Sequence, residues 1–478
     1  MKKILFVGAE VMPFAATGGL GDVMGSLPAA IKAADESTDI RVVMPLYRAI
    51  DESWREQMTE VATFHVWLSW RKLYCGVKSL CREGVTYYFI DNEYYFDREG
   101  LYGHYDDGER YAYFCMAVLE MLSHIDFFPD VLHAHDWQGA LSIVYLDRFF
   151  RGRTGYEKIR TVYTIHNIEY QGHYDFSILY DVFGLGEEMH DILAYDGRIN
   201  LMKGAIVCAN LVSTVSPRYA EEIRSGEFAH RLEYIINDNA HKLRGILNGI
   251  DYVFYDPAHD GAIAHRFSAE TAEEKVKNKT ALQRELGLPE GEKIPMLAMI
   301  SRLATHKGLD LVWQVADGLL ATENFQLVVL GTGEERYERF FEELAHRFPD
   351  RVRALLRYDR TLSKRIYAAA DLFVMPSRSE PCGLAQMIAS RYGAIPVVRE
   401  TGGLFDSIKG YYEEDGEPRG NGFTFAGYRA DELYERILAA LALYRQKEKW
   451  QALVTRVMRS DFSWSVSAQK YLAMYQEL

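Results

Sequence analysis

Short apolar runs alternate with longer helical stretches along most of this chain, and this alternation limits the folds that the chain can adopt. The first half opens with apolar runs at residues 4–8 and 41–45, and the second half with runs at 296–300 and 325–330. Strands that alternate with helices predict parallel sheets with helices on both faces. Because the pattern occurs in both halves, we expect an α/β chain with two doubly wound, Rossmann-like domains.

The length of 478 residues also fits two domains. We expect the first domain over residues 1–250 and the second over 251–460, with a linker region at 256–266. Residues 461–478 predict a terminal helix, which we expect to pack back on the first domain.

One stretch departs from the alternation of strands and helices. Over residues 61–90 the pattern has a period of two, which is typical of antiparallel strands. Turn signals at Cys75-Gly76 and Glu83-Gly84 place the predicted hairpin turns.

Composition narrows the class of protein. A net charge of −14 disfavours a general nucleic-acid binder, although a local basic pocket can still hold a phosphate. The cysteines are scattered and form no C-x-x-C pair, which fits free thiols in a reducing cytoplasm. Since no run of about 18 apolar residues occurs, we expect no membrane span.

A carboxylate, Glu380, lies between a predicted strand at 372–376 and a predicted helix at 385–393. Ligands of open α/β sheets bind outside the carboxyl ends of the strands. The amides of Gly383 and Leu384 open the predicted helix and suit a phosphate. An ordinary helix cap would use similar residues, so this stretch by itself leaves both interpretations open.

Two cations follow another predicted strand of the second half. Arg302 and Lys307 lie on the loop after residues 296–300, where they can neutralise a diphosphate without a metal. Cations on loops are more often simply solvated. Because this loop and that of Glu380 both follow strands of one predicted sheet, we expect the two loops to lie within reach of one ligand.

The first half supplies polar residues at several strand ends. A glycine-rich loop, Thr17-Gly18-Gly19-Leu20-Gly21-Asp22, follows the first strand and lets a ligand approach the backbone, with Asp22 expected to cap a helix over 22–32. His135-Asp136, His166-Asn167 and Asn248-Gly249 end other strands. His133 and His135 are candidate metal ligands, but no third ligand occurs at a suitable spacing, so a metal site is disfavoured.

Familiar nucleotide motifs are incomplete. Met24 and Arg336 stand where the third glycine of a G-x-G-x-x-G motif belongs, which disfavours a dinucleotide oxidoreductase. The sequence contains neither a P-loop nor a D-x-D pair that would bridge a metal to a diphosphate.

Over nearly its whole length the chain resembles the bacterial glycogen synthases and plant starch synthases. The matching stretches are Thr17-Gly18-Gly19-Leu20-Gly21-Asp22, His133-Ala134-His135-Asp136-Trp137, Thr164-Ile165-His166-Asn167, Leu247-Asn248-Gly249, Ser301-Arg302-Leu303 with Lys307-Gly308-Leu309-Asp310, Glu380-Pro381-Cys382-Gly383-Leu384 and Thr401-Gly402-Gly403-Leu404. The resemblance implies a retaining GT-B glucosyltransferase, with two Rossmann-like domains facing a central cleft. It also implies glucose transfer from ADP-glucose to the non-reducing 4-OH of an α-1,4-glucan such as glycogen, with no metal or other cofactor.

The resemblance also implies roles for individual residues. Glu380 would hold glucose hydroxyls, Arg302 and Lys307 the diphosphate, and His166 would sit over the anomeric carbon. Asp136 completes this implied catalytic set and would hold sugar hydroxyls. The further substrate-binding residues implied are Thr17, Gly18, Gly19, Asp22, Asn248, Tyr358 (stacked on adenine), Cys382, Gly383 and Leu384. The first domain would then serve the acceptor and catalysis, and the second would bind the nucleotide sugar.

Two positions depart from the family pattern. Ala16 stands where the family usually has a lysine that reaches the donor phosphates, and Ala385 replaces a common threonine. A preference for UDP-glucose, another GT-B donor or acceptor, and a glucan-binding scaffold without activity therefore stay open as alternatives.

Overall fold

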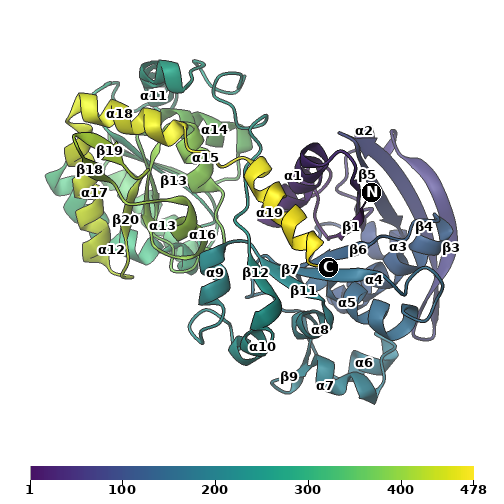
Figure 1. Ribbon diagram of the computed structural model, residues 1–478. Coiled ribbons are helices and arrows are strands. Elements are labelled where there is room, and N and C mark those ends of the chain that lie inside the picture. The colour runs from purple at the N-terminus through teal and green to yellow at the C-terminus, as the bar shows by residue number, and fades with distance from the viewer. Residues whose placement is uncertain (1) are drawn as a thin grey trace. The chain divides into compact units, whose positions relative to one another are not determined.

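The computed structural model describes residues 2–478 and divides the chain into two compact units (Figure 1). Unit 1 comprises Met1–Gly249 and Trp464–Leu478, and unit 2 comprises Ile250–Ser463. Each unit is built around its own sheet, and each is described separately below.

The sheet of unit 1 has nine strands in the order β12-β11-β7-β6-β1-β2-β5-β4-β3. Neighbours from β12 to β5 are parallel, whereas β4 and β3 are antiparallel. The chain moves outward from β1 in one direction and, from β6, in the other, so the strand order reverses between β1 and β6. The strands are β1 (Lys3–Val7), β2 (Asp39–Pro45), β3 (Thr59–Leu68), β4 (Arg71–Arg82), β5 (Val85–Asp91), β6 (Val131–His135), β7 (Arg160–Ile165), β11 (Leu211–Thr214) and β12 (Leu243–Gly245).

The antiparallel part of this sheet confirms one predicted turn and corrects the other. Glu83 and Gly84 form the turn between β4 and β5, both with positive φ. Cys75-Gly76 is not a turn but lies inside β4, where Gly76 pairs with Thr63 on one side and Asp91 on the other. The prediction was wrong because Cys75 is fully buried in the sheet and the real turn follows Leu68.

Helices cover the sheet of unit 1, and the last of them comes from the end of the chain. In Figure 1, α19 (Trp464–Gln476) lies beside α1 (Gly19–Ala34), and both belong to unit 1. Helix α1 begins at Gly19 with Gly18 as its N-cap, so Asp22 lies in the first turn. The prediction that Asp22 caps this helix was therefore wrong. The remaining elements are α2 (Glu52–Arg55), α3 (Glu93–Phe96), α4 (Asp107–His124), α5 (Asp136–Tyr145), η1 (Leu146–Phe150), β8 (His173–Tyr174), α6 (Ser177–Asp181), η2 (Glu187–Met189), α7 (His190–Leu193), β9 (Ala194–Tyr195), β10 (Arg198–Asn200), α8 (Leu201–Cys208), α9 (Pro217–Glu222), α10 (Glu233–Asp238) and η3 (Ala240–Lys242).

The sheet of unit 2 is wholly parallel, with six strands in the order β15-β14-β13-β16-β17-β20. Numbered along the chain, this is the Rossmann order 3-2-1-4-5-6, which reverses between β13 and β16. The strands are β13 (Met296–Ile300), β14 (Gln326–Leu330), β15 (Val352–Leu355), β16 (Leu372–Met375), β17 (Ile395–Arg399) and β20 (Phe423–Phe425).

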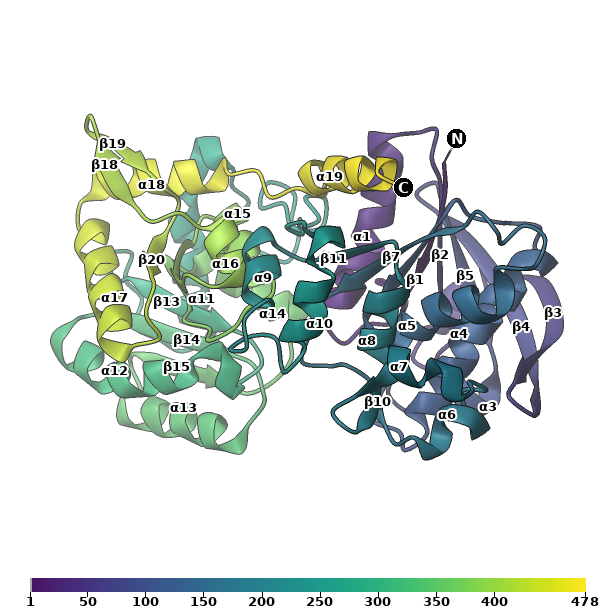
Figure 2. The same ribbon diagram turned by 60° about the horizontal axis from the view of Figure 1, so that its bottom comes forward.

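The helices of unit 2 lie on both faces of this sheet, α11 and α14 on one side and α12 and α13 on the other (Figures 1 and 2). The elements are η4 (Ala269–Glu274), α11 (Lys275–Glu285), η5 (Thr305–Lys307), α12 (Leu309–Thr322), α13 (Glu335–Arg347), α14 (Arg360–Ala369), α15 (Ala385–Arg391), α16 (Gly402–Ser407), the hairpin strands β18 (Tyr412–Glu414) and β19 (Glu417–Arg419), α17 (Ala430–Tyr444) and α18 (Lys447–Met458).

The expected linker at 256–266 is a packed part of unit 2. Asp260 is 8% exposed and accepts hydrogen bonds or ion pairs from Tyr392 and Lys364, the latter at 3.2 Å. Asp256 pairs with Arg391 at 3.0 Å. These buried anchors hold the segment against α14 and α15, which polar composition alone does not reveal.

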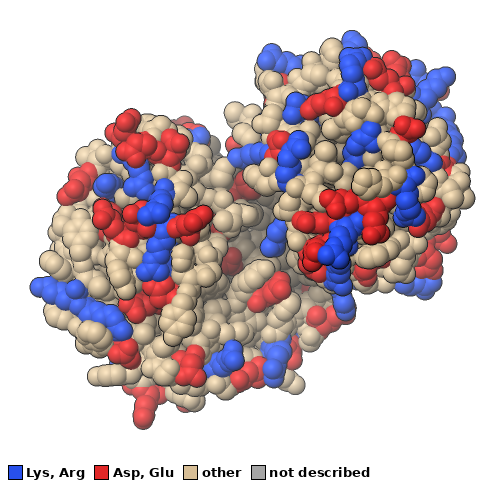
Figure 3. Space-filling view, turned by 180° about the vertical axis from the view of Figure 1, so that it is seen from behind, with Lys and Arg blue, Asp and Glu red and all other residues tan. Residues whose placement is uncertain are grey.

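Charged side chains of both signs are mixed on one face of the molecule. On the face shown in Figure 3, Lys and Arg alternate with Asp and Glu and are not gathered into one extended basic area. Within residues 2–478, no helix is long and apolar enough to cross a membrane.

Candidate active site

In unit 2 the structure brings together Lys307 and Glu380. Lys307 follows β13 and Glu380 follows β16, the two neighbouring strands between which the strand order reverses. The Lys307 Nζ lies 2.7 Å from Oε2 of Glu380 and 3.0 Å from Oε1. Ser377 Oγ also donates to Oε2, at 3.0 Å, and Glu380 is only 6% exposed. The two loops that were expected to serve one ligand are therefore in direct contact, and the Glu380 carboxylate is held in one orientation. That they bind the same ligand stays a prediction.

Glycines allow these loops to pack at backbone distance. Gly308, directly after Lys307, has φ +71°, and a Cβ there would lie 2.0 Å from the carbonyl oxygen of Pro376. Gly402 has φ +44°, and a Cβ there would lie 2.0 Å from the carbonyl oxygen of Glu380. Since no larger residue fits either position, the glycines fix where Lys307 and Glu380 stand relative to each other.

The residues that precede α15 are fixed by a side chain that the sequence analysis missed. Gln386 is fully buried, and its Nε2 donates to the carbonyl oxygens of Cys382 (3.1 Å) and Gly383 (2.9 Å). Cys382 is itself buried, and Leu384 is the N-cap residue of α15. The sequence showed only an amide side chain near the start of the predicted helix, and its burial appears only in the structure.

Arg302 and Tyr358 are exposed at the carboxyl ends of β13 and β15. Tyr358 is 87% exposed. For the described residues, the structure shows no contact that joins either side chain to Glu380. The prediction that both serve the same ligand therefore rests on their strand ends and not on a direct contact.

In unit 1 a buried carboxylate, Glu10, organises the glycine-rich loop. Its Oε2 accepts the backbone N–H groups of Thr17 (2.6 Å) and Gly18 (3.1 Å), and its Oε1 accepts the hydroxyls of Thr17 (2.8 Å) and Tyr102 (2.7 Å). Glu10 is 5% exposed, whereas Thr17, Gly18 and Gly19 are exposed. The sequence analysis missed Glu10, although an acid three residues after the end of an apolar strand was a usable signal.

His166, Asp136 and His135 meet across the ends of β6 and β7. Oδ1 of Asp136 accepts the backbone N–H of His166 at 2.8 Å, and His166 Nε2 lies 2.9 Å from His135 Nδ1. Asp136 adopts φ +53°, in the left-handed region. Burial raises the pKa of Asp136 to about 7 and lowers the pKa of His166 to about 3. The His166 imidazole is therefore neutral at pH 7.

His133 has no ring nitrogen left for a metal ion. Its Nδ1 lies 2.7 Å from the Tyr475 hydroxyl on α19, and its Nε2 lies 2.6 Å from Oγ1 of Thr164. Among the described residues, no group of three or more His, Cys, Asp or Glu side chains could hold a metal. A metal site built on both His133 and His135 therefore has no support in this geometry.

Asn248 follows β12 and is 5% exposed. Its Oδ1 is buried and has no hydrogen-bond partner among the described residues. A buried polar atom without a partner is uncommon and needs an explanation, of which a bound ligand is one.

Comparison with known proteins places these sites in a family. The family model described as the starch synthase catalytic domain matches residues 3–238, and the model described as glycosyl transferases group 1 matches residues 278–453. The glycogen synthase of Geobacillus thermodenitrificans is 47% identical over 478 residues, which cover 100% of this chain and 98% of that protein. The glycogen synthase of Clostridium beijerinckii is 47% identical over 479 residues, with 100% and 99% covered.

A solved structure agrees with this placement. The catalytic domain of starch synthase IV from Arabidopsis thaliana, bound to ADP and acarbose, is 34% identical and superposes with a TM-score of 0.90, covering 100% of this chain and 99% of that chain. Two Rossmann-like units with polar loops at their strand-order reversals define a GT-B glycosyltransferase. The chain belongs to the family of glycogen synthases and starch synthases, whose members act on a nucleotide sugar and a glucan.

Proposed function

We propose that this enzyme transfers glucose from ADP-glucose to the non-reducing 4-OH of an α-1,4-glucan, with retention of the anomeric configuration. The observation that carries the proposal is the buried Lys307–Glu380 pair at the β13/β16 strand-order reversal, where a Rossmann-like sheet binds its ligand. The ADP bound by the related starch synthase supports an adenine nucleotide as the donor.

Unit 2 is proposed to hold the donor. Lys307 and the exposed Arg302 would bind the diphosphate, and their charges would stabilise the ADP leaving group as negative charge develops on it. Glu380 would accept hydrogen bonds from glucose hydroxyls, because Lys307 and Ser377 already fix its oxygens. The backbone before α15 at Cys382, Gly383 and Leu384 would line the phosphates, and Tyr358 would stack on the adenine.

Unit 1 is proposed to act at the reacting carbon and on the acceptor. His166 would lie over the anomeric carbon, and because its imidazole is neutral it would not repel the positive charge that develops there. Asp136 positions His166 through the backbone N–H group. Asn248, whose Oδ1 is unpaired among the described residues, would accept a sugar hydroxyl, and Thr17, Gly18, Gly19 and Asp22 would border the substrate.

The donor nucleotide is the least constrained part of the proposal, because Ala16 replaces the lysine that is usual in the family. Gly21 packs closely on this position, since a Cβ on Gly21 would lie 2.2 Å from the Ala16 Cβ. Because that lysine is absent, UDP-glucose stays the alternative donor. Cytoplasmic localisation and a metal-free reaction are further parts of the proposal.

Product analysis tests the reaction. Labelled glucose from ADP-glucose should enter glycogen in the presence of EDTA, and β-amylase should release the label as maltose, as expected for a new α-1,4 bond at a non-reducing end. Label that resists β-amylase, or that appears only as free glucose, would contradict glucan elongation.

A further inference from the structure

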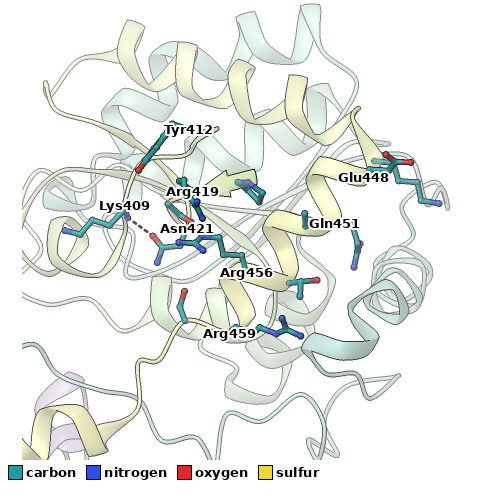
Figure 4. A pocket seen from close by; sticks show the side chains of 14 residues that line it. Lys409, Tyr412, Arg419, Asn421, Glu448, Gln451, Arg456 and Arg459 are labelled. Carbon is teal, nitrogen blue, oxygen red and sulfur yellow. Dashed lines mark hydrogen bonds between the residues drawn. The ribbon is translucent and has the colours of Figure 1, made fainter. Parts of the chain in front are cut away.

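Unit 2 contains a large pocket that shares no residue with the loops of Lys307 and Glu380. The pocket has a volume of about 1270 Å³ and lies between one face of α18 and the β18–β19 hairpin with the loop that follows it (Figure 4). Residues from Lys447 to Arg456 line it along α18, a helix about 18 Å long. The pocket is thus an open groove along a whole helix.

Cations outnumber acids in this groove, although the whole chain carries a net charge of −14. Glu448 is the one acidic residue in the lining. The five cationic lining residues are Lys409, Arg419, Lys447, Arg456 and Arg459. Arg419 pairs with Glu414 at 2.8 Å and Arg459 with Glu270 at 3.5 Å. Among the side chains that the structure describes, Lys409, Lys447 and Arg456 have no carboxylate partner. A hollow with an excess of one charge concentrates ligands of the opposite charge.

Two guanidinium groups are held at the centre of the groove. Arg456 Nε donates to the carbonyl oxygen of Gly420 at 2.7 Å. Arg419, the residue before Gly420, is held by its own Nε, which donates to Oε2 of Glu414 at 2.8 Å. Asn421 fixes the same loop, because its Oδ1 accepts the N–H of Lys409 (2.6 Å) and its Nδ2 donates to the carbonyl oxygen of Ser407 (3.0 Å). Figure 4 shows Arg419, Asn421 and Arg456 together in the middle of the pocket. Two guanidinium forks fixed near each other suit an oxyanion such as a phosphoryl group.

Neutral groups suited to a sugar surround this centre. Tyr412 is 56% exposed and lines the groove on the hairpin side, and Gln451 and Thr455 line the wall formed by α18. None of these three side chains makes a hydrogen bond within the described part of the chain. An aromatic face beside an unpaired amide and hydroxyl suits a hydroxylated ring better than a bare ion.

From this arrangement we propose that the groove between α18 and the β18–β19 hairpin binds a phosphorylated sugar, separately from the donor. Arg419 and Arg456 would hold the phosphoryl group, and Tyr412, Gln451 and Thr455 would contact the sugar. Two sources share this chemistry, namely a free sugar phosphate and a phosphate ester carried by a glucan chain.

Calorimetric titration in 150 mM salt, with the donor site saturated by ADP, tests the proposal. The probes are glucose 6-phosphate, glucose, inorganic phosphate, and phosphorylated maltodextrin with and without phosphatase treatment. The variants are Arg456→Gln and Arg419→Gln, and the matched control is Lys449→Gln. Lys449 lies on the same helix outside the pocket and pairs with Glu413, so its substitution removes the same charge.

We expect glucose 6-phosphate to bind, glucose not to bind, and each arginine variant to weaken binding about tenfold while the control binds as the parent does. Binding of phosphorylated maltodextrin alone, with the same dependence on both arginines, would identify glucan as the source and support the site. Equal affinity of parent and arginine variants, or binding of no phosphorylated probe, would overturn the proposal. Inorganic phosphate that binds as tightly as glucose 6-phosphate would mean an adventitious ion only.

Discussion

The ammonium group of Lys307 lies within 3.0 Å of both carboxylate oxygens of Glu380. The two side chains are largely buried, 18% exposed for Lys307 and 8% for Glu380, so solvent screens the attraction between their charges less than that of an exposed ion pair. One cation can then serve two purposes, since it orients Glu380 before the donor binds and carries a charge that the leaving diphosphate needs.

Replacement of Lys307 tests this double purpose. We expect Lys307→Gln to lower kcat/KM for ADP-glucose by about 10²-fold or more. In other enzymes, removal of one group that stabilises developing charge lowers the rate by about this factor. The measurement is initial rates with glycogen as acceptor, beside Lys449→Gln as an exposed ion-pair control. Glycogen binding should persist in Lys307→Gln, and a variant that keeps full activity would remove Lys307 from the mechanism.

Asp136 allows a test by pH. Burial raises its pKa to about 7 in the folded chain, whereas an unfolded chain has an Asp pKa near about 3.9. Between these values the folded state binds more protons than the unfolded state, so stability falls as pH rises and the loss is complete above pH 7. Asp136→Asn cannot ionise, tolerates a positive φ, and keeps an oxygen for the His166 N–H group.

We therefore expect Asp136→Asn to be more stable than the parent by about 1–3 kcal/mol at pH 8, with the gain shrinking to nothing near pH 4. Urea denaturation at pH 4.5, 6 and 8 measures this difference. Asp175→Asn is the control in which the stability change should have the opposite sign, a loss at pH 8. Hydrogen bonds from Ser177 lower the pKa of the exposed Asp175, so its charged form stabilises the folded state. A stability difference for Asp136→Asn that does not change with pH would contradict the assignment.

At the scale of residues, the sequence located the loops of Lys307 and Glu380 but not the side chains that hold such loops in place. The meeting of Lys307 and Glu380 follows from two loops at the carboxyl ends of strands in one sheet. Glu10 and Gln386 could not be found in the same way, because each acts on backbone groups whose positions only the folded loops define. The roles proposed for all these residues stay predictions until they are measured.

At the scale of elements, the turn from β13 into α12 sets the position of Lys307. Gly308 has positive φ and no room for a Cβ beside Pro376. We expect Gly308→Ala to destabilise the chain by at least about 2 kcal/mol and to lower transfer activity, because the loop must move away from β16.

Thermal unfolding and initial rates of the same preparation measure both effects. Gly318→Ala is the matched control on the same helix: Gly318 has φ in the ordinary range, and its nearest neighbour for a Cβ is a Tyr434 ring carbon at 3.6 Å. In a helix interior this change should stabilise by about 0.5–1 kcal/mol. Equal stability of the two alanine variants would show that the turn does not depend on Gly308.

Periodicity predicted the long apolar strands well and the short elements poorly. The strand expected at 296–300 coincides with β13 (Met296–Ile300), because five consecutive apolar residues mark a buried parallel strand. Strand β20 was missed, since Phe423–Phe425 is too short to show a period and lies among glycines and polar residues. Asp22 was misplaced because glycines hid the true start of α1.

At the scale of the whole molecule, the family's usual lysine belongs to unit 1, whereas the proposed donor site belongs to unit 2. Ala16→Lys tests whether both units act on the donor. We expect it to raise kcat/KM for ADP-glucose about tenfold, as one added charge-assisted contact to a phosphate would. Donor titrations of parent and variant measure the change, and a variant with unchanged donor kinetics would show that Ala16 is already compensated.

The most direct test of the account compares initial rates of glucose transfer to glycogen from ADP-glucose and from UDP-glucose, side by side and in EDTA. We predict rapid transfer from ADP-glucose, much slower transfer from UDP-glucose, and no loss of rate in EDTA. Transfer from neither donor, with glycogen still bound, would contradict the proposed reaction and leave a glucan-binding protein without activity.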